Sequence, residues 1–264
     1  MAIEAARQRS VEKGLTICGF DLRQIYFSQA LVIPEPSGQV ETMFCMKQYP
    51  ESAKSSSSSW DEFFVYSASE QGEWVEHCRG HISARRSNMI NFVDGQSQKE
   101  KAEHEHQRQK AEADLVCKKS IEGSVLYLQL ADIGLDYGRS FANLATARVE
   151  DGHQGAPSSK TRKAIGTVIH PDIEKVMPSN HQSLSVIHPT ILDAFFHVAI
   201  AAPNQIKSAA VPTFISSVFV SGNFSTLPHH EFFVYAQIDE ADNQNPNITL
   251  NVYDFGSNDA MPSV

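Results

Sequence analysis

The sequence predicts an α+β fold made of two similar halves, each a curved sheet with one central helix. Short segments rich in β-branched and aromatic residues recur in two groups, and each group is associated with a stretch of helical periodicity. A charged segment with few apolar residues separates the groups. A chain of 264 residues, 41% of them hydrophobic, can bury one large core or two small ones.

The first predicted half covers residues 1–83. Residues 1–12 have the spacing of a helix, but no Ser, Thr, Asp or Asn precedes them as an N-cap. We therefore expect Met1 to lie inside a helix that starts upstream, although an ordinary frayed terminus explains this feature equally well. The strand-like segments that follow are 15–22, 25–33, 40–46, 60–67 and 73–81.

Residues 84–115 are rich in Lys, Glu, Gln, Arg and His, which predicts a solvated and partly helical linker between the halves. The second half, residues 116–264, repeats the pattern of the first. It has a helical stretch at 121–133 and an apolar helix that begins at Pro189. Its strand-like segments are 141–149, 163–169, 214–220, 231–239 and 249–255.

Composition excludes several classes of function. The formal net charge of -9 argues against nucleic acid as a partner, because phosphate binding needs clustered Lys and Arg. Apolar runs are far shorter than the roughly 20 residues of a membrane helix, and the N-terminus does not resemble a signal peptide, so we expect no membrane association and a cytoplasmic location. The four cysteines form no CxxC pair, which favours reduced structural thiols over a metal site.

The apolar helix that begins at Pro189 contains the most informative residues. Asp193 and His197 lie four positions apart and therefore project from one face of this helix. An acid in apolar surroundings must be hydrogen-bonded, protonated or functional. A buried structural Asp-His contact and a functional pair explain the spacing equally well.

Two motifs carry a resemblance to a known family. The pattern His188-Pro189-x-x-Leu-Asp193-x-x-x-His197 resembles the second catalytic motif of polyketide synthase dehydratases. The segment from Tyr137 to Phe141 resembles the Tyr-Gly-x-x-Phe element near the pocket of that family, although Arg139 stands where Pro is frequent. Residues 1–8, 17–34 and 74–81 are similar to the dehydratases of fungal highly reducing synthases, so the resemblance covers nearly the whole chain.

The resemblance implies a double hotdog fold with an incomplete first half. It also implies removal of water from a β-hydroxyacyl thioester, with Asp193 as the catalytic acid and His197 as the residue that orients it. The substrate would be presented on the phosphopantetheine of an acyl carrier protein, and no cofactor or metal would be bound directly. Substrate-pocket positions carried over from the family are Tyr137, Gly138, Phe141, His188, Pro189 and Pro212.

The catalytic base of the family is a His in a His-x-x-x-Gly-x-x-x-x-Pro motif, and none of the eleven histidines of this sequence fits it. We therefore expect a dehydratase fragment that starts at an internal methionine and is inactive alone. Expected partners are the carrier protein and other synthase domains, with a possible homodimer. The alternatives are a noncatalytic scaffold that retains acyl binding and, last, a product-template cyclase of the same fold.

Overall fold

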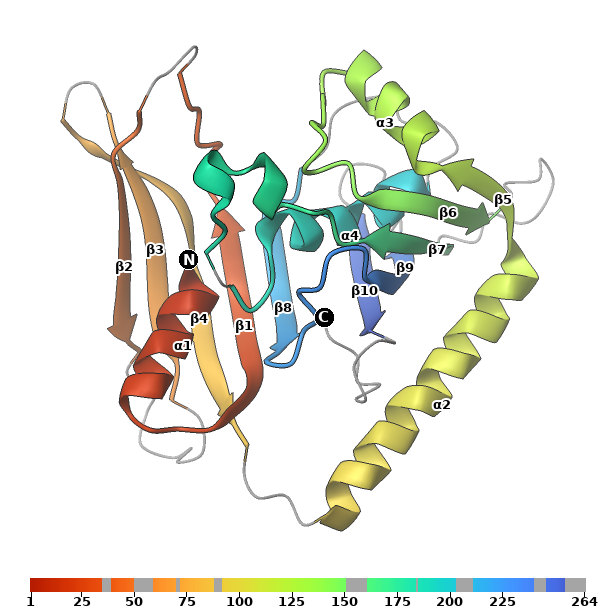
Figure 1. The fold of residues 1–264 in the computed structure, drawn as a ribbon, viewed down its shortest axis with the longest axis horizontal. Helices are drawn as coiled ribbons and strands as arrows, with labels where there is room; N and C mark the ends of the chain where they lie inside the picture. The colour runs from red at the N-terminus through yellow and green to blue at the C-terminus, as the bar shows by residue number, and fades with distance from the viewer. Residues whose placement is uncertain are drawn as a thin grey trace. The chain divides into compact units, whose positions relative to one another are not determined.

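The computed structural model describes residues 1–34, 39–49, 59–69, 72–87, 92–150, 161–183, 185–202, 211–239 and 246–254. The chain forms two compact units (Figure 1). Unit 1 comprises Met1–Met89 and Ala210–Asn223, and unit 2 comprises Ile90–Ala209 and Phe224–Val264. Each unit contains an antiparallel five-stranded sheet.

Unit 1 consists of one helix packed on a sheet. Helix α1 spans Ala2–Glu12 and packs against strand β4, burying Ala6 and Ser10. Met1 lies in its cap position and makes no side-chain capping hydrogen bond. The sheet has the order β2-β3-β4-β1-β8. Its strands are β1 (Ile17–Phe27), β2 (Thr42–Gln48), β3 (Asp61–Ala68), β4 (Trp74–Arg86) and β8 (Phe214–Ser221).

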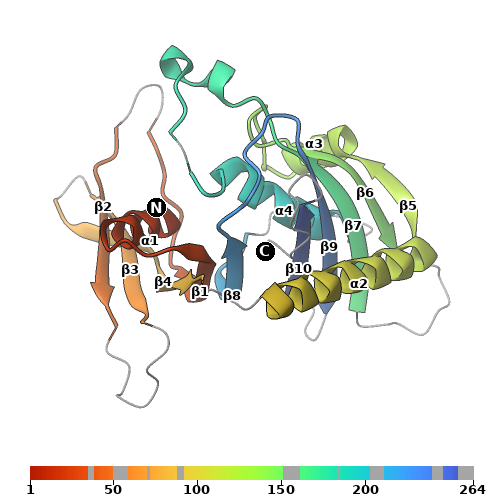
Figure 2. The same ribbon diagram turned by 60° about the horizontal axis from the view of Figure 1, so that its bottom comes forward.

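Unit 2 contains a second sheet, with the order β10-β9-β7-β6-β5. Helix α4 packs against strands β6, β7, β9 and β10, whereas α2 packs against β5 and β7 (Figure 2). The strands are β5 (Cys117–Glu122), β6 (Leu144–Glu150), β7 (Thr161–Ile169), β9 (Glu231–Asp239) and β10 (Asn247–Asp254). The helices are α2 (Phe92–Val116), α3 (Gly123–Asp132) and α4 (Pro189–Ala201), with two short 3₁₀ turns, Glu174–Val176 and Pro178–Asn180.

The two faces of the unit 2 sheet are covered by different helices. Ile165 of β7 pairs with Tyr235 of β9, and both pack with Ala113 at the end of α2. The next residue of β7, Gly166, faces α4, because a Cβ atom there would come within 2.7 Å of Val198 Cγ2. Successive residues of a strand point to opposite faces, so α2 and α4 lie on opposite sides of this sheet.

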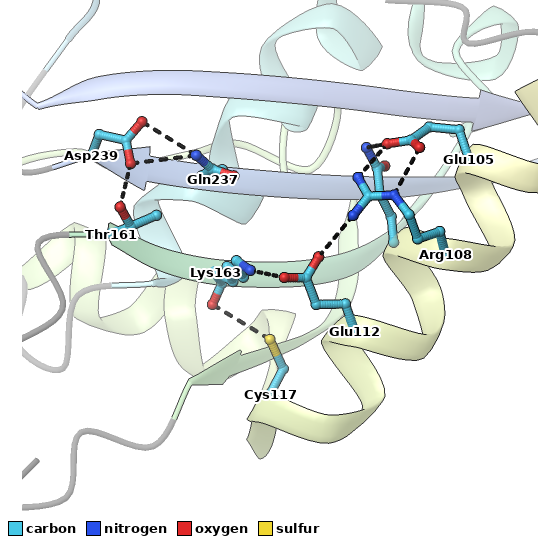
Figure 3. Close-up of polar contacts among 9 residues, drawn as sticks. Glu105, Arg108, Glu112, Cys117, Thr161, Lys163, Gln237 and Asp239 are labelled. Carbon is cyan, nitrogen blue, oxygen red and sulfur yellow. Dashed lines mark hydrogen bonds and ion pairs between the residues drawn. The ribbon is translucent and has the colours of Figure 1, made fainter.

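Charged side chains connect α2 to its face of the sheet (Figure 3). Glu112 of α2 forms an ion pair with Lys163 of β7, and Arg108 bridges Glu105 at 2.6 Å and Glu112 at 3.6 Å. The thiol of Cys117 donates a hydrogen bond to the carbonyl of Lys163 at 3.5 Å. These contacts fix the end of α2 beside β7.

The segment predicted as a solvated linker, residues 84–115, is therefore different in the structure. Most of it belongs to α2, a helix that covers a sheet, and among the α2 side chains that the structure describes the buried ones are His106, Gln109 and Ala113. Their spacing of three and four places them on one helical face. Two of these three are polar, so apolar periodicity does not mark this face of the helix. The buried amide of Gln109 still has a hydrogen-bond partner, because Tyr253 donates its hydroxyl to Gln109 Oε1 at 2.9 Å.

The strand pairing also differs from the predicted halves. Strand β8 belongs to the predicted second half, residues 116–264, but it pairs with β1 and so completes the sheet of unit 1. The segments predicted as separate strands at 15–22 and 25–33 contribute to a single strand, β1. Gln24 has a φ of 50° at the position where the register against β4 shifts, which breaks the side-chain alternation of that strand.

Three histidines have a pKa that burial lowers, and from them we predict how the stability of the fold depends on pH. Burial lowers the pKa of His106, and the charge of Lys110 lowers it further. Burial also lowers the pKa of His170 and of His188. The unfolded chain then binds more protons than the folded one as the pH falls through about 6.5, so stability should decrease from about pH 7.5 to about pH 5.5.

Urea unfolding across this pH range, followed by the helical circular dichroism signal, measures the effect. Replacing His106 by Gln should reduce the pH dependence, because one protonation difference is removed. Both tryptophans, Trp60 and Trp74, lie in unit 1, so their fluorescence reports that unit separately. A stability that rises as the pH falls through this range would contradict the prediction.

Candidate active site

Helix α4 begins with a cap made by His188. The residue has extended backbone angles, and its Nδ1 atom accepts the backbone amide of Thr190 at 3.3 Å and the Thr190 hydroxyl at 2.8 Å. Pro189 follows as the first helical residue, where its missing amide hydrogen costs nothing. His188 and Pro189 therefore define where the helix starts, and their predicted contact with substrate stays a prediction.

The predicted pair on α4 is brought together by the helix. His197 is fully buried, whereas the side chain of Asp193 is 41% exposed. His197 Nε2 lies 3.2 Å from Asp193 Oδ2. The two atoms are not aligned as a hydrogen bond, and Nε2 has no aligned acceptor in the described part of the chain. The pair is therefore a close contact between a buried imidazole and a carboxyl group at the rim of the core.

Two tyrosines flank the imidazole of His197. The ring of Tyr137 lies 4.5 Å from the His197 ring, edge to face, and the ring of Tyr127 lies 5.5 Å from it. The hydroxyl of Tyr127 is 2.9 Å from His197 Nδ1. The same hydroxyl oxygen accepts the backbone amide of Leu144 at 2.8 Å.

Both tyrosines stay protonated near neutral pH. Burial raises the pKa of Tyr127, and the amide of Leu144 offsets this only in part. Burial also raises the pKa of Tyr137, and the charge of Asp193 raises it further.

Helix α3 presents Tyr127 because its first turn lies directly on β6. A side chain at Gly123 would overlap the carbonyl oxygen of Leu144, so only glycine allows the helix to start there. Tyr127 follows one turn later and reaches the amide of Leu144. Sequence reasoning missed this residue. The available signal was a tyrosine hydroxyl between the buried Leu126 and Leu130, since a buried phenol normally has a hydrogen-bond partner.

The remaining predicted pocket residues have different surroundings. Gly138 and Phe141 form a turn after Tyr137, in which the Phe141 amide donates to the Gly138 carbonyl at 2.9 Å. The Phe141 side chain is 41% exposed. Pro212 lies in unit 1, in the exposed segment before β8. The structure thus brings together Asp193, His197 and Tyr137, and the pocket roles of the other residues stay predictions.

Across the ranges given above, no cluster of three or more His, Cys, Asp or Glu side chains is arranged to hold a metal ion. None of the helices in those ranges is both long and apolar enough to cross a bilayer.

The chemistry of this site follows from its acid. Asp193 places a carboxyl group at the edge of an apolar helix, beside a buried imidazole and near two protonated phenols, and a carboxyl group is one of the side chains that serve in general acid-base catalysis. Each unit has an antiparallel sheet with a helix packed on one face, α1 in unit 1 and α4 in unit 2, and in unit 2 the opposite face is covered by α2. This arrangement is that of the double hotdog proteins, and Asp193 lies on helix α4 of the second unit.

Comparisons with known proteins agree with that class. The family described as "Polyketide synthase dehydratase N-terminal domain" matches residues 105–258, which is more than half of the chain. A dehydratase domain from the CurF module of the curacin polyketide synthase aligns with a TM-score of 0.57 at 20% identity, covering 96% of this chain and 76% of that one. The chain belongs to the polyketide synthase dehydratase family.

Fungal synthases provide closer sequence relatives. The highly reducing polyketide synthase tstA of Talaromyces stipitatus is 35% identical over 261 residues, which cover 96% of this chain and 10% of tstA. The reducing polyketide synthase PKS1 of Cochliobolus heterostrophus is 33% identical over 262 residues, covering 97% of this chain and 10% of that protein. The chain spans about a tenth of the length of these relatives. The predicted fold class and its fungal reducing relatives are confirmed.

Proposed function

We propose that this chain supplies the acid half of a dehydratase site that converts a β-hydroxyacyl thioester into an α,β-enoyl thioester. The observation that carries the proposal is Asp193, a half-exposed carboxyl group in contact with the buried His197 on the apolar helix α4. In the family resemblance, these two positions are the catalytic acid and the residue that orients it.

The proposed reaction divides between an acid and a base. A base removes the proton from the α-carbon, and the electron pair of that C–H bond forms the new carbon-carbon double bond. The bond between the β-carbon and its hydroxyl oxygen breaks, and protonated Asp193 donates to that oxygen, so that water leaves. No histidine of this sequence lies in the motif expected for the base, so the chain alone should catalyse this reaction weakly or not at all.

The partners follow from the same proposal. The substrate would arrive on the phosphopantetheine of an acyl carrier protein, and the other domains of a polyketide synthase would act before and after this one. No directly bound cofactor is required, because both proton transfers use side chains. We place the reaction in the cytoplasm and include a homodimer among the possible assemblies.

A fusion protein tests the proposal. The segment of tstA that directly precedes its matched region, in which the family resemblance expects the His motif, is joined to residue 1 of this chain. Enoyl product from a β-hydroxyacyl-N-acetylcysteamine thioester is then measured for the fusion and for the chain alone. We expect the fusion to be faster by about 10² to 10⁴, the usual contribution of a general base.

Two outcomes would favour the alternatives. Tight binding of the thioester without enoyl product in either protein would support a noncatalytic acyl-binding scaffold, which the missing base motif already makes the second candidate. Aldol-cyclised product in place of the enoyl thioester would support a product-template cyclase.

A further inference from the structure

Tyr127, His197 and Asp193 form a continuous line of polar groups across unit 2. The Tyr127 hydroxyl is 2.9 Å from Nδ1 of the imidazole, and Nε2 on the opposite side of the ring is 3.2 Å from Asp193 Oδ2. Tyr127 comes from α3 and the other two residues come from α4. The buried ring of His197 therefore lies between a hydroxyl within hydrogen-bond distance of Nδ1 and a half-exposed carboxyl group in close contact with Nε2.

The surroundings of Tyr127 determine where its proton points. Its oxygen accepts the backbone amide of Leu144 at 2.8 Å, and an amide N–H can only donate. Burial keeps the phenol protonated by raising its pKa. The backbone amide of Asn143 also donates toward this oxygen. Among the described residues, His197 Nδ1 at 2.9 Å is the neighbouring group that can accept the phenol proton. The phenol proton is therefore donated to Nδ1.

This direction selects one form of the imidazole. A neutral imidazole has one protonated and one unprotonated nitrogen, and Nδ1 must be the unprotonated one if it accepts the phenol proton. The opposite form would direct the N–H groups of both Leu144 and Nδ1 at one phenol oxygen, and the described residues would then offer no acceptor to the phenol proton. Nε2 therefore carries the hydrogen and directs it toward the side of Asp193.

We propose that Tyr127 is a positioning residue for the catalytic acid: it fixes His197 as the Nε2–H form, so that the imidazole donates to Asp193 Oδ2 and leaves the acid proton on Oδ1. This inference rests on the proposed function for its catalytic meaning. The Asp193 side chain is 41% exposed, so it is the partner with room to rotate into line with Nε2. Oδ1, the oxygen away from the imidazole, is then the one that donates to substrate.

Nitrogen NMR of the whole chain, with the histidine rings labelled with ¹⁵N, tests this assignment. The signals of His197 are identified by their loss in His197→Gln. We expect Nδ1 to resonate in the downfield region of unprotonated nitrogens and Nε2 in the upfield region of protonated ones. In Tyr127→Phe the tautomers should mix, so that the two shifts move toward each other.

Tyr137→Phe is the matched control. Its ring flanks the same imidazole at 4.5 Å, but no hydrogen bond joins its hydroxyl to His197 within the described residues. The tautomer should therefore be unchanged in that variant. A protonated Nδ1 in the wild-type chain, or equal shifts in Tyr127→Phe and wild type, would overturn the inference. If Tyr127→Phe does not fold, the wild-type spectrum still decides between the two forms.

Kinetics of the fusion protein separate this inference from the proposed function. Tyr127→Phe should lower kcat about tenfold with little change in KM, the rate change that corresponds to one hydrogen bond of ordinary strength. An inactive fusion with the expected wild-type tautomer would contradict the proposed function alone. An active fusion with a protonated Nδ1 would contradict the positioning role alone.

Discussion

Replacing Asp193 by Asn is expected to lower enoyl formation by the fusion protein by about 10² to 10⁴, the range that general acid catalysis usually supplies. Asn has nearly the same shape as Asp and can still meet His197, but it has no acidic proton for the departing hydroxyl. The side chain is 41% exposed, so the substitution leaves no charged group buried without a partner. The fold should therefore persist while kcat falls.

Asp132→Asn provides the matched control for this experiment. Asp132 is an exposed carboxylate at the end of α3, and the same chemical change there should leave the rate unchanged. Hydrolysis of the thioester is measured in parallel, so that substrate lost by hydrolysis is not counted as dehydration. Equal rates for Asp193→Asn and the unmodified fusion would remove Asp193 from the role of acid.

The contact between Asp193 and His197 could be predicted from the sequence, whereas the contact between His197 and Tyr127 could not. Asp193 and His197 belong to one helix, so a spacing of four residues was enough to bring them together. Tyr127 reaches the same imidazole from 70 positions away in the chain. That contact requires α3 to pack on β6 at Gly123. Packing between distant segments leaves no pattern in the local sequence.

The fold shows the same division between local and long-range information. The helix from Pro189 and most strands were predicted because their apolar and β-branched residues are contiguous in sequence. The inward face of α2 was not predicted, because His106 contacts Phe233 of β9 and Gln109 contacts Tyr253 of β10, and both partners lie more than 100 positions away in the sequence. Strand β8 was assigned to the wrong sheet because its pairing with β1 joins residues almost 200 positions apart.

Replacing Phe195 by Ala is expected to destabilise unit 2 by about 3 to 5 kcal/mol, the usual cost of removing a buried aromatic side chain. Phe195 is fully buried, on the same helix as Asp193. Its ring lies 5.9 Å from the ring of Phe224 and 5.6 Å from that of Phe232, which stack on each other at 4.7 Å. The variant therefore leaves a cavity between α4 and β9.

Urea unfolding followed by helical circular dichroism measures this loss, because α2, α3 and α4 all belong to unit 2. Leu128→Ala is the control: that side chain is 69% exposed on α3, and its removal should change stability by no more than about 0.5 kcal/mol. Dehydration by the fused Phe195→Ala variant should fall only near its lowered unfolding temperature, since the acid itself is intact. A loss of rate far below that temperature would instead mean that the packing of Phe195 sets the position of Asp193.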